Sequence, residues 1–168
     1  MVLERRKIIR NLFRNIKYGI ENLILWFPII WRDRNWDHVY IYDIFRHKLD
    51  LMEKNIRKYG NHVDAEKDSD KIKICVNLLD RLLKDKYHNN AYKDYYKKWG
   101  ETQIEWGDEN KSGSSLVKIT HPNVKTDKDK KEERKHYKRC MDHEQYLKEQ
   151  DLDLLFKTMR KHIQKWWD

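Results

Sequence analysis

The sequence lacks the residue patterns by which common catalytic and cofactor-binding sites are recognised. Only five glycines occur in its 168 residues, and none belongs to a G-x-G or Walker-type phosphate loop. No serine stands in a nucleophile elbow, and neither an H-E-x-x-H nor a C-x-x-C motif is present. These absences exclude the enzyme classes that local motifs identify. We therefore predict a protein that is not an enzyme and uses no cofactor.

Cysteines and long apolar runs are also scarce. Cys75 and Cys140 form no metal or redox motif, and a secreted domain of this size would seldom rely on one disulfide. The longest apolar run, residues 23–31, is about half as long as a membrane-spanning helix. Charged residues such as Arg10 and Arg14 interrupt the region where a signal peptide would be apolar. We expect a chain in a reducing cytoplasm with no membrane partner.

Positive charge is what the sequence has in excess. Lys and Arg number 37 against 28 Asp and Glu, which gives a net charge of +9. The excess is concentrated in residues 1–35, where eight basic residues stand against three acidic ones. This balance favours an anionic partner, whether nucleic acid, a nucleotide, an acidic membrane face or an acidic protein.

Helical periodicity dominates the first hundred residues. Apolar residues at three- and four-residue steps predict helices over residues 4–25, 37–60 and 72–87. Pro28 is expected to end the first helix or to start a new one, and Gly60 to cap the second in a left-handed conformation. Residues 88–99 then continue as a tyrosine-rich helix. We expect its stripe to be core or interface rather than a ligand cage: Tyr92, Tyr95, Tyr96 and Trp99.

The spacing of apolar residues changes from a helical period to alternation after residue 100. Alternation over residues 102–106 and a β-prone stretch at 116–120 predict a single hairpin. A charged segment follows, and Asp151 is expected to cap a last helix. The predicted fold is mainly α, a helical bundle of about five or six helices with one small β-hairpin inserted before the last two helices. It forms a single domain, residues 1–168: helical 1–99, a hairpin region 101–121 and a C-terminal helical pair 126–168.

The densest chemistry lies in WFPIIWRDRNWDH, residues 26–38. Flat indoles stack on bases, and guanidinium groups grip phosphate oxygens in pairs. The competing interpretation, which we favour, is that the three tryptophans seal the join between two helices while the polar side chains contact an anion. A second basic and aromatic cluster lies near the C-terminus. The candidate ligand-binding residues are Arg32, Arg34, Trp36, His38, Tyr40, Arg160 and Trp167.

One segment resembles a metal site. Helical spacing places Glu133, His136, Cys140 and His143 on one stripe, and a Glu-x-x-His pair is used in di-metal helical bundles. With eight histidines and 28 acidic residues, however, such pairs arise by chance. A charged helix face with Cys140 turned inward is the better interpretation, and we predict no metal.

Several segments together resemble a family of small uncharacterised proteins from tailed bacteriophages. They are WFPIIWRDRNWDHVYIY, DAEKDSDKIKICVNLLDRLLKD, VKTDKDKKEERKHYKRC and LDLLFKTMRKHIQKWWD, which lie along most of the chain. The resemblance supplies no active site. It implies a viral accessory protein in the host bacterial cytoplasm, where small phage proteins commonly act by binding.

The expected function is therefore that of a phage-encoded, non-catalytic binding protein. We expect a counter-defence role in which the chain, as a homo-oligomer, sequesters an anionic nucleotide-type ligand. Two alternatives remain open. The chain could bind nucleic acid through its basic N-terminal helix and residues 125–139, with affinity that falls steeply with salt. It could instead inhibit a host enzyme through exposed aromatic residues.

Overall fold

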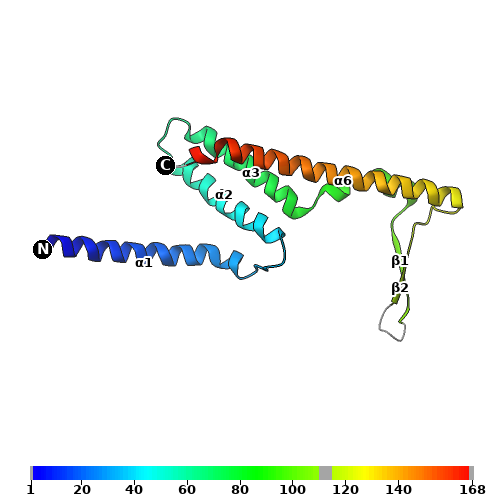
Figure 1. The fold of residues 1–168 in the computed structure, drawn as a ribbon, viewed down its shortest axis with the longest axis horizontal. Coiled ribbons are helices and arrows are strands. Elements are labelled where there is room, and N and C mark those ends of the chain that lie inside the picture. Colours follow the sequence, from blue (N-terminus) through cyan, green and yellow to red (C-terminus); the bar gives the residue numbers. More distant parts are fainter. Residues whose placement is uncertain (1, 110–114, 167–168) are drawn as a thin grey trace.

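The computed structural model describes the backbone of residues 2–109 and 115–166. Figure 1 shows an elongated, mainly helical molecule with a β-hairpin that projects from one end, which confirms the predicted fold class. The elements are α1 (Val2–Ile30), α2 (Val39–Tyr59), α3 (Ala65–Lys84), α4 (Tyr87–Ala91), α5 (Lys93–Trp99), β1 (Gln103–Glu109), β2 (Ser115–Thr120), α6 (Asp127–His162) and a single 3₁₀ turn (Ile163–Lys165).

The main core lies between α2, α3 and α6. Helix α3 occupies the centre, because it packs against both α2 and α6. The predicted stripe of α3 is buried as expected, and Trp166 closes the cluster. The apolar residues at three- and four-residue steps that predicted α2 are buried only in the middle of the helix, since Ile41 and Tyr59 near its two ends are exposed. The buried set is Leu49, Ile56, Ile72, Cys75, Val76, Leu78, Leu79, Leu155 and Trp166.

Gly60 ends α2 as predicted, but for a different physical reason. Its backbone is extended (φ −62°, ψ 125°), so the predicted left-handed cap is wrong. Its N–H donates to the carbonyl oxygen of Ile56 over 2.8 Å. A Cβ atom at this position would lie 2.5 Å from the same oxygen, so close approach of the backbone favours glycine here.

A second, aromatic core joins the short helices α4 and α5 to α6. Tyr92 interrupts the single helix predicted for residues 88–99, and its side chain is buried with those of Tyr95, Trp99 and Cys140. The tyrosine stripe is thus core, as expected. Cys75 and Cys140 are free and buried in the two separate cores.

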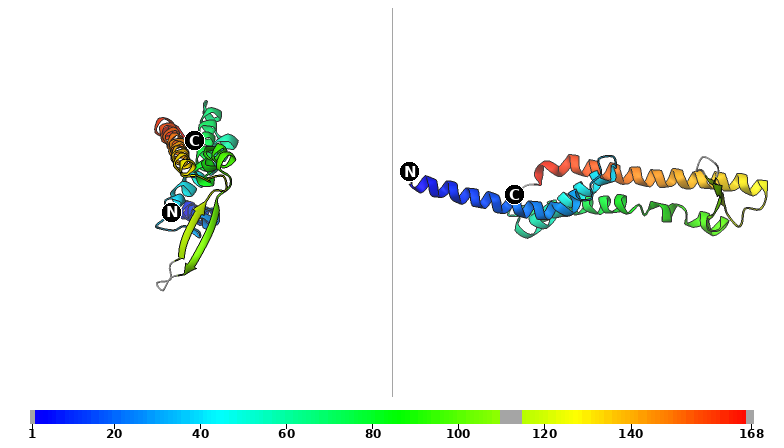
Figure 2. Two further views of the ribbon diagram at one scale, coloured as in Figure 1. Left: turned by 90° about the vertical axis from the view of Figure 1, so that its right-hand side faces the viewer. Right: turned by 90° about the horizontal axis from the view of Figure 1, so that it is seen from below.

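The hairpin has the predicted antiparallel pairing, with Gln103 opposite Thr120 and Trp106 opposite Val117. Figure 2 shows that it projects away from the helices, and the Trp106 side chain is exposed. Gly100, with a φ of +83°, turns the chain out of α5. At the base, the N–H of Asn123 donates to the carbonyl oxygen of Trp99 over 3.2 Å.

Helix α6 is one continuous helix, so the predicted C-terminal helical pair is wrong. Thr126 caps its start, because its hydroxyl accepts from the N–H of Asp129 and the Asp129 carboxylate accepts from the N–H of Thr126. These hydrogen bonds hold the pKa of Asp129 below its usual value. Asp151, predicted to be a cap, lies buried inside α6, where its carboxylate accepts from Tyr87 and pairs with Arg81.

Helix α1 continues through Pro28 to Ile30, so the predicted break is wrong. A proline so close to the helix end removes one backbone hydrogen bond without interrupting a following turn. Near this end α1 contacts α2, where Ile29 is buried and the Trp26 ring meets the His47 ring at 4.9 Å. No helix in the described ranges is long and apolar enough to cross a bilayer.

Candidate ligand-binding hollow in the linker between α1 and α2

The linker between α1 and α2 is a pair of tight turns. The N–H of Trp31 donates to the carbonyl oxygen of Phe27 over 2.9 Å, which closes α1. The N–H of Asp37 then donates to the carbonyl oxygen of Arg34 over 3.0 Å. The Asp37 carboxylate accepts from the N–H of Val39 and so satisfies a donor at the start of α2. These bonds hold the linker side chains in a defined arrangement.

Of the five candidate residues between Arg32 and Tyr40, four line one open hollow of about 410 Å³, which we call the linker hollow. Its lining residues come from the linker and from the first two turns of α2. The lining residues are Asp33, Arg34, Asn35, Trp36, Asp37, His38, Tyr40, Ile41 and Ile44.

The tryptophans lie differently from the interpretation that we favoured. Trp36 is 83% exposed and Trp31 is 72% exposed, so the prediction that they seal a helix join is wrong. The Trp26 ring, by contrast, contacts the His47 ring of α2. Trp31 packs loosely on Phe27, with ring centroids 5.3 Å apart. Trp36 therefore presents its indole to solvent at the edge of the linker hollow.

The two arginines have unequal roles. Arg32 donates from Nε to the carbonyl oxygen of Pro28 over 3.0 Å, and its Nη2 lies 3.6 Å from the Asp43 carboxylate. Arg32 thus links the end of α1 to α2 and is not among the lining residues. Arg34 donates through Nη1 to the carbonyl oxygen of Asp33 over 2.7 Å. Its other guanidinium donors remain available, which makes Arg34 the better anion contact.

The two C-terminal candidates are not brought to the linker hollow. Arg160 lies exposed near the end of α6, which Figure 1 places beside the end of α2 remote from the linker. Trp167 lies outside the described residues. The seven candidate ligand-binding residues therefore do not form a single site. Four of them, close to the linker, lie together in the linker hollow.

Helix α6 uses its metal-like side chains for packing. Glu133 accepts from the Tyr95 hydroxyl, and His136 Nδ1 accepts from the indole N–H of Trp99 over 3.1 Å. Burial raises the pKa of the Cys140 thiol, and His143 is exposed. Within the part of the chain that the structure describes, no group of three potential ligands is placed to hold a metal.

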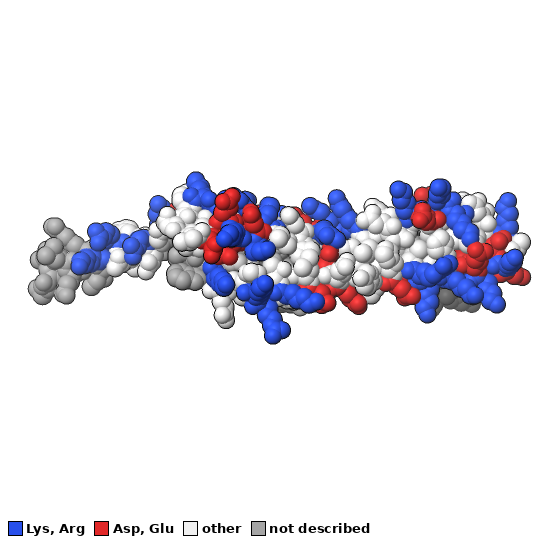
Figure 3. Space-filling view, turned by 90° about the horizontal axis from the view of Figure 1, so that it is seen from above, with Lys and Arg blue, Asp and Glu red and all other residues white. Residues whose placement is uncertain are grey.

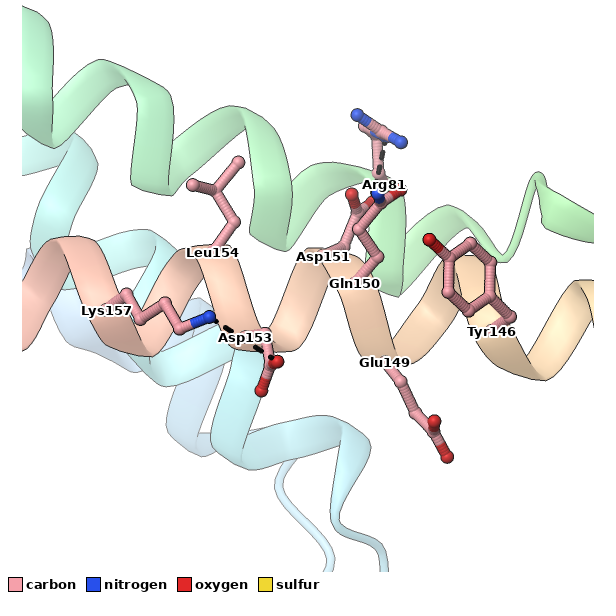
Figure 4. A pocket seen from close by; sticks show the side chains of 8 residues that line it. All are labelled: Arg81, Tyr146, Glu149, Gln150, Asp151, Asp153, Leu154 and Lys157. Carbon is pink, nitrogen blue, oxygen red and sulfur yellow. Dashed lines mark ion pairs between the residues drawn. The ribbon is translucent and has the colours of Figure 1, made fainter.

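Two other hollows are lined by residues with partners. Figure 4 shows the one beside α6, where Arg81 pairs with Asp151 and Lys157 pairs with Asp153. The other lies near the base of the hairpin, where two lining cations are paired: Lys118 with Glu105 and Lys130 with Asp127. Neither offers the exposed indole beside a guanidinium that the linker hollow offers.

Sequence reasoning missed Ile41 and Ile44 as lining residues. Ile41 belongs to the apolar series predicted for α2, which suggested a core position, and Ile44 lies outside that series. Their position in the first turns of α2, beside the linker and far from Gly60, was the signal that could have indicated a place at the linker hollow. Comparison with known protein families, with curated proteins and with solved structures finds no match. The function must therefore be inferred from the residues of this chain.

Proposed function

We propose that this chain is a non-catalytic binding protein that captures an anionic nucleotide-type ligand in the linker hollow. The observation that carries the proposal is the convergence of Arg34, Trp36, His38 and Tyr40 on one open hollow. A flat indole can stack on a base, and a guanidinium and an imidazole can donate hydrogen bonds to a phosphate. We further propose that the chain is phage-encoded and that this capture serves counter-defence by sequestration.

Size and exposure support a small ligand. A hollow of about 410 Å³ falls within the range of roughly 300 to 1,000 Å³ usual for small-molecule sites. The 83% exposed indole of Trp36 can stack on a base without any rearrangement of the fold. The carboxylate of Asp37 is already engaged by the N–H of Val39, which reduces its repulsion of a bound phosphate.

The arrangement of charge favours a nucleotide over a nucleic acid. Figure 3 shows Lys and Arg side chains along the molecule with Asp and Glu side chains interspersed among them. Several cations near the hairpin are paired, as in the contact of Lys98 with Glu132 at 2.5 Å. A phosphate backbone would meet these acids as well as the cations, whereas a small ligand at Arg34 would meet two acids, Asp33 and Asp37.

Replacement of Trp36 or Arg34 by Ala is expected to weaken nucleotide binding at least tenfold. Loss of the indole removes base stacking, which is worth about 1 to 3 kcal/mol, and loss of the guanidinium removes the phosphate contact. Calorimetric titration with ADP-ribose and with cyclic di-AMP measures this effect. Because both side chains are exposed, the melting temperature should be unchanged.

Arg160→Ala is the matched control, since it removes the same guanidinium from the far end of α6. It should bind these nucleotides like the unaltered chain. Ribose 5-phosphate, which has a phosphate but no base, should bind weakly. If the purified chain binds neither nucleotide, or if Trp36→Ala binds both with unchanged affinity, the proposal is wrong, and inhibition of a host protein through the same exposed aromatics becomes the better hypothesis.

A further inference from the structure

Helix α1 carries a regular apolar pattern that the fold leaves uncovered. Ile9, Ile16, Leu23 and Ile30 recur every seven residues, and a second apolar residue stands four residues after each of the first three. Alternating steps of four and three are the pattern by which one helix packs along another. We call this set the α1 seam: Ile9, Phe13, Ile16, Ile20, Leu23, Phe27 and Ile30.

The seam faces away from the rest of the molecule. At 100° per residue, Ile29, which is buried, and Leu25 lie on the side of the helix opposite the seam. Leu25 and Trp26 line a hollow with Met52 and Ile56 of α2. The seven seam side chains are between 50% and 69% exposed. The Trp31 ring meets Phe27 near one end of the seam, and no other element of the described residues packs on the remainder of these roughly 30 Å of apolar helix.

We propose that the occupant of the α1 seam is the α1 helix of a second copy of this chain, packed antiparallel. Uncovered apolar surfaces of this extent mark interaction sites. The seam and the flanking Leu12 and Ile24 would bury roughly 700 Å² per copy if each half-exposed side chain contributes about 80 Å², close to the ~800 Å² per partner of a stable interface. A self-complementary patch of this kind gives a two-fold dimer.

The spacing favours a helix over a lipid surface as the occupant. A bilayer accepts any broad apolar face, whereas a seven-residue repeat places each side chain in the gap between side chains of a second helix. Figures 1 and 2 show that the N-terminal half of α1 extends beyond the other helices. A second helix can therefore lie along the N-terminal half of the seam without meeting them.

Charge decides the relative direction of the two helices. The described cations of α1 are Lys7, Arg10 and Arg14 in its N-terminal half and Lys17 just past its midpoint, where Lys17 lies 3.8 Å from the Glu21 carboxylate. Parallel helices would bring the basic halves of both copies together. Antiparallel helices place each basic half beside residues 22–30 of the other copy, which carry no charge, and also oppose the two helix dipoles.

Glutamate substitutions on the two faces of α1 test the dimer. By light scattering during gel filtration at tens of micromolar, the unaltered chain should have twice the 21.0 kDa chain mass. Ile16→Glu with Leu23→Glu should reduce it to one chain mass. Asn11→Glu with Asn15→Glu adds the same charge on the opposite, exposed face and should remain dimeric. Circular dichroism should be equal in all three, because none of these residues is in a core.

A monomeric unaltered chain, or a seam variant that remains dimeric, would overturn the proposal. If the monomer co-sediments with phosphatidylglycerol vesicles, lipid is the occupant instead. Ile9→Cys tests the direction, since the native Cys75 and Cys140 are buried. Antiparallel helices separate the two introduced thiols by about 30 Å, so no disulfide should form under oxidation. Rapid cross-linking would show a parallel pair.

Discussion

Raising the pH from 9 to 12 is expected to unfold the protein. Burial raises the pKa of Tyr87, Tyr92 and Tyr95 well above the usual tyrosine value of about 10 in the folded chain. Burial likewise raises the pKa of the Cys75 thiol to about 11. These groups lose their protons at a lower pH in the unfolded chain than in the folded chain. Their contribution to the stability of the folded chain is therefore complete below the unfolded pKa and is lost as the pH rises above that value.

The expected effect is comparable to the whole stability of a domain. Each buried tyrosine contributes about 1.4 kcal/mol per pH unit between its unfolded and folded pKa. Three tyrosines over two pH units therefore remove about 8 kcal/mol, against the roughly 5 to 15 kcal/mol that a native domain has. Urea unfolding followed by circular dichroism between pH 8 and pH 12 measures the loss.

Phenylalanine variants separate tyrosine ionisation from general alkaline effects. Tyr92→Phe removes one ionisable hydroxyl from the aromatic core and should reduce the slope above pH 10 by about 1.4 kcal/mol per pH unit. Tyr146→Phe is the control, because Tyr146 is 58% exposed and should leave the slope unchanged. An equal slope for all three proteins would show that these hydroxyls do not govern alkaline unfolding.

Asp151→Ala is expected to lower the free energy of unfolding by about 2 to 4 kcal/mol. The Asp151 carboxylate is 3% exposed and accepts from the Tyr87 hydroxyl over 2.5 Å, while Nε of Arg81 lies 3.0 Å away. Arg81 can turn to water after the change. The Tyr87 hydroxyl cannot, because its residue is buried, so a donor is left without an acceptor.

Asp153→Ala provides the matched control two residues along the same helix (Figure 4). Its carboxylate pairs with Lys157 at 3.8 Å, and both side chains are 77% exposed. Water screens such a pair, so its loss should change the midpoint of urea unfolding very little. A similar midpoint for Asp151→Ala and Asp153→Ala would show that the buried contact adds no stability.

The two regions that sequence periodicity described best are the centre of α2 and residues 72–79 of α3, whereas the first turns of α3, from Ala65, were not predicted as helix. Leu49, Ile56, Ile72 and Leu79 are buried where the three- and four-residue spacing predicts them. The hairpin was predictable for a similar reason, since alternation from residue 103 to 106 is a local signal. Local patterns succeed in α2 and α3 because each helix packs against its neighbours on the face that the pattern marks. In the hairpin the pattern succeeds because the two strands pair with each other, although their described apolar side chains are exposed.

The candidate site was only partly predictable. The sequence placed Arg34, Trp36, His38 and Tyr40 together because they are close neighbours along the chain. Their exposure was not predictable, because it depends on whether α1 folds back onto the bundle. Since α1 meets α2 by the face of Leu25 and Ile29, Trp36 stays in solvent. The exclusion of Arg32 from the linker hollow likewise follows from its contact with Asp43 on α2.

By itself, then, the sequence determined the mainly helical fold, the hairpin, the two-sided character of α1 and the positive charge, because periodicity and composition are local properties of the chain. Only the tertiary structure decided which apolar faces are covered. In that structure α2 and α6 cover α3 on two sides, whereas the α1 seam is exposed. Asp151, which was expected to cap a helix, is a buried partner of Tyr87. The physical reason is that burial is a relation between elements, and no local pattern specifies which neighbour an apolar or charged face will meet.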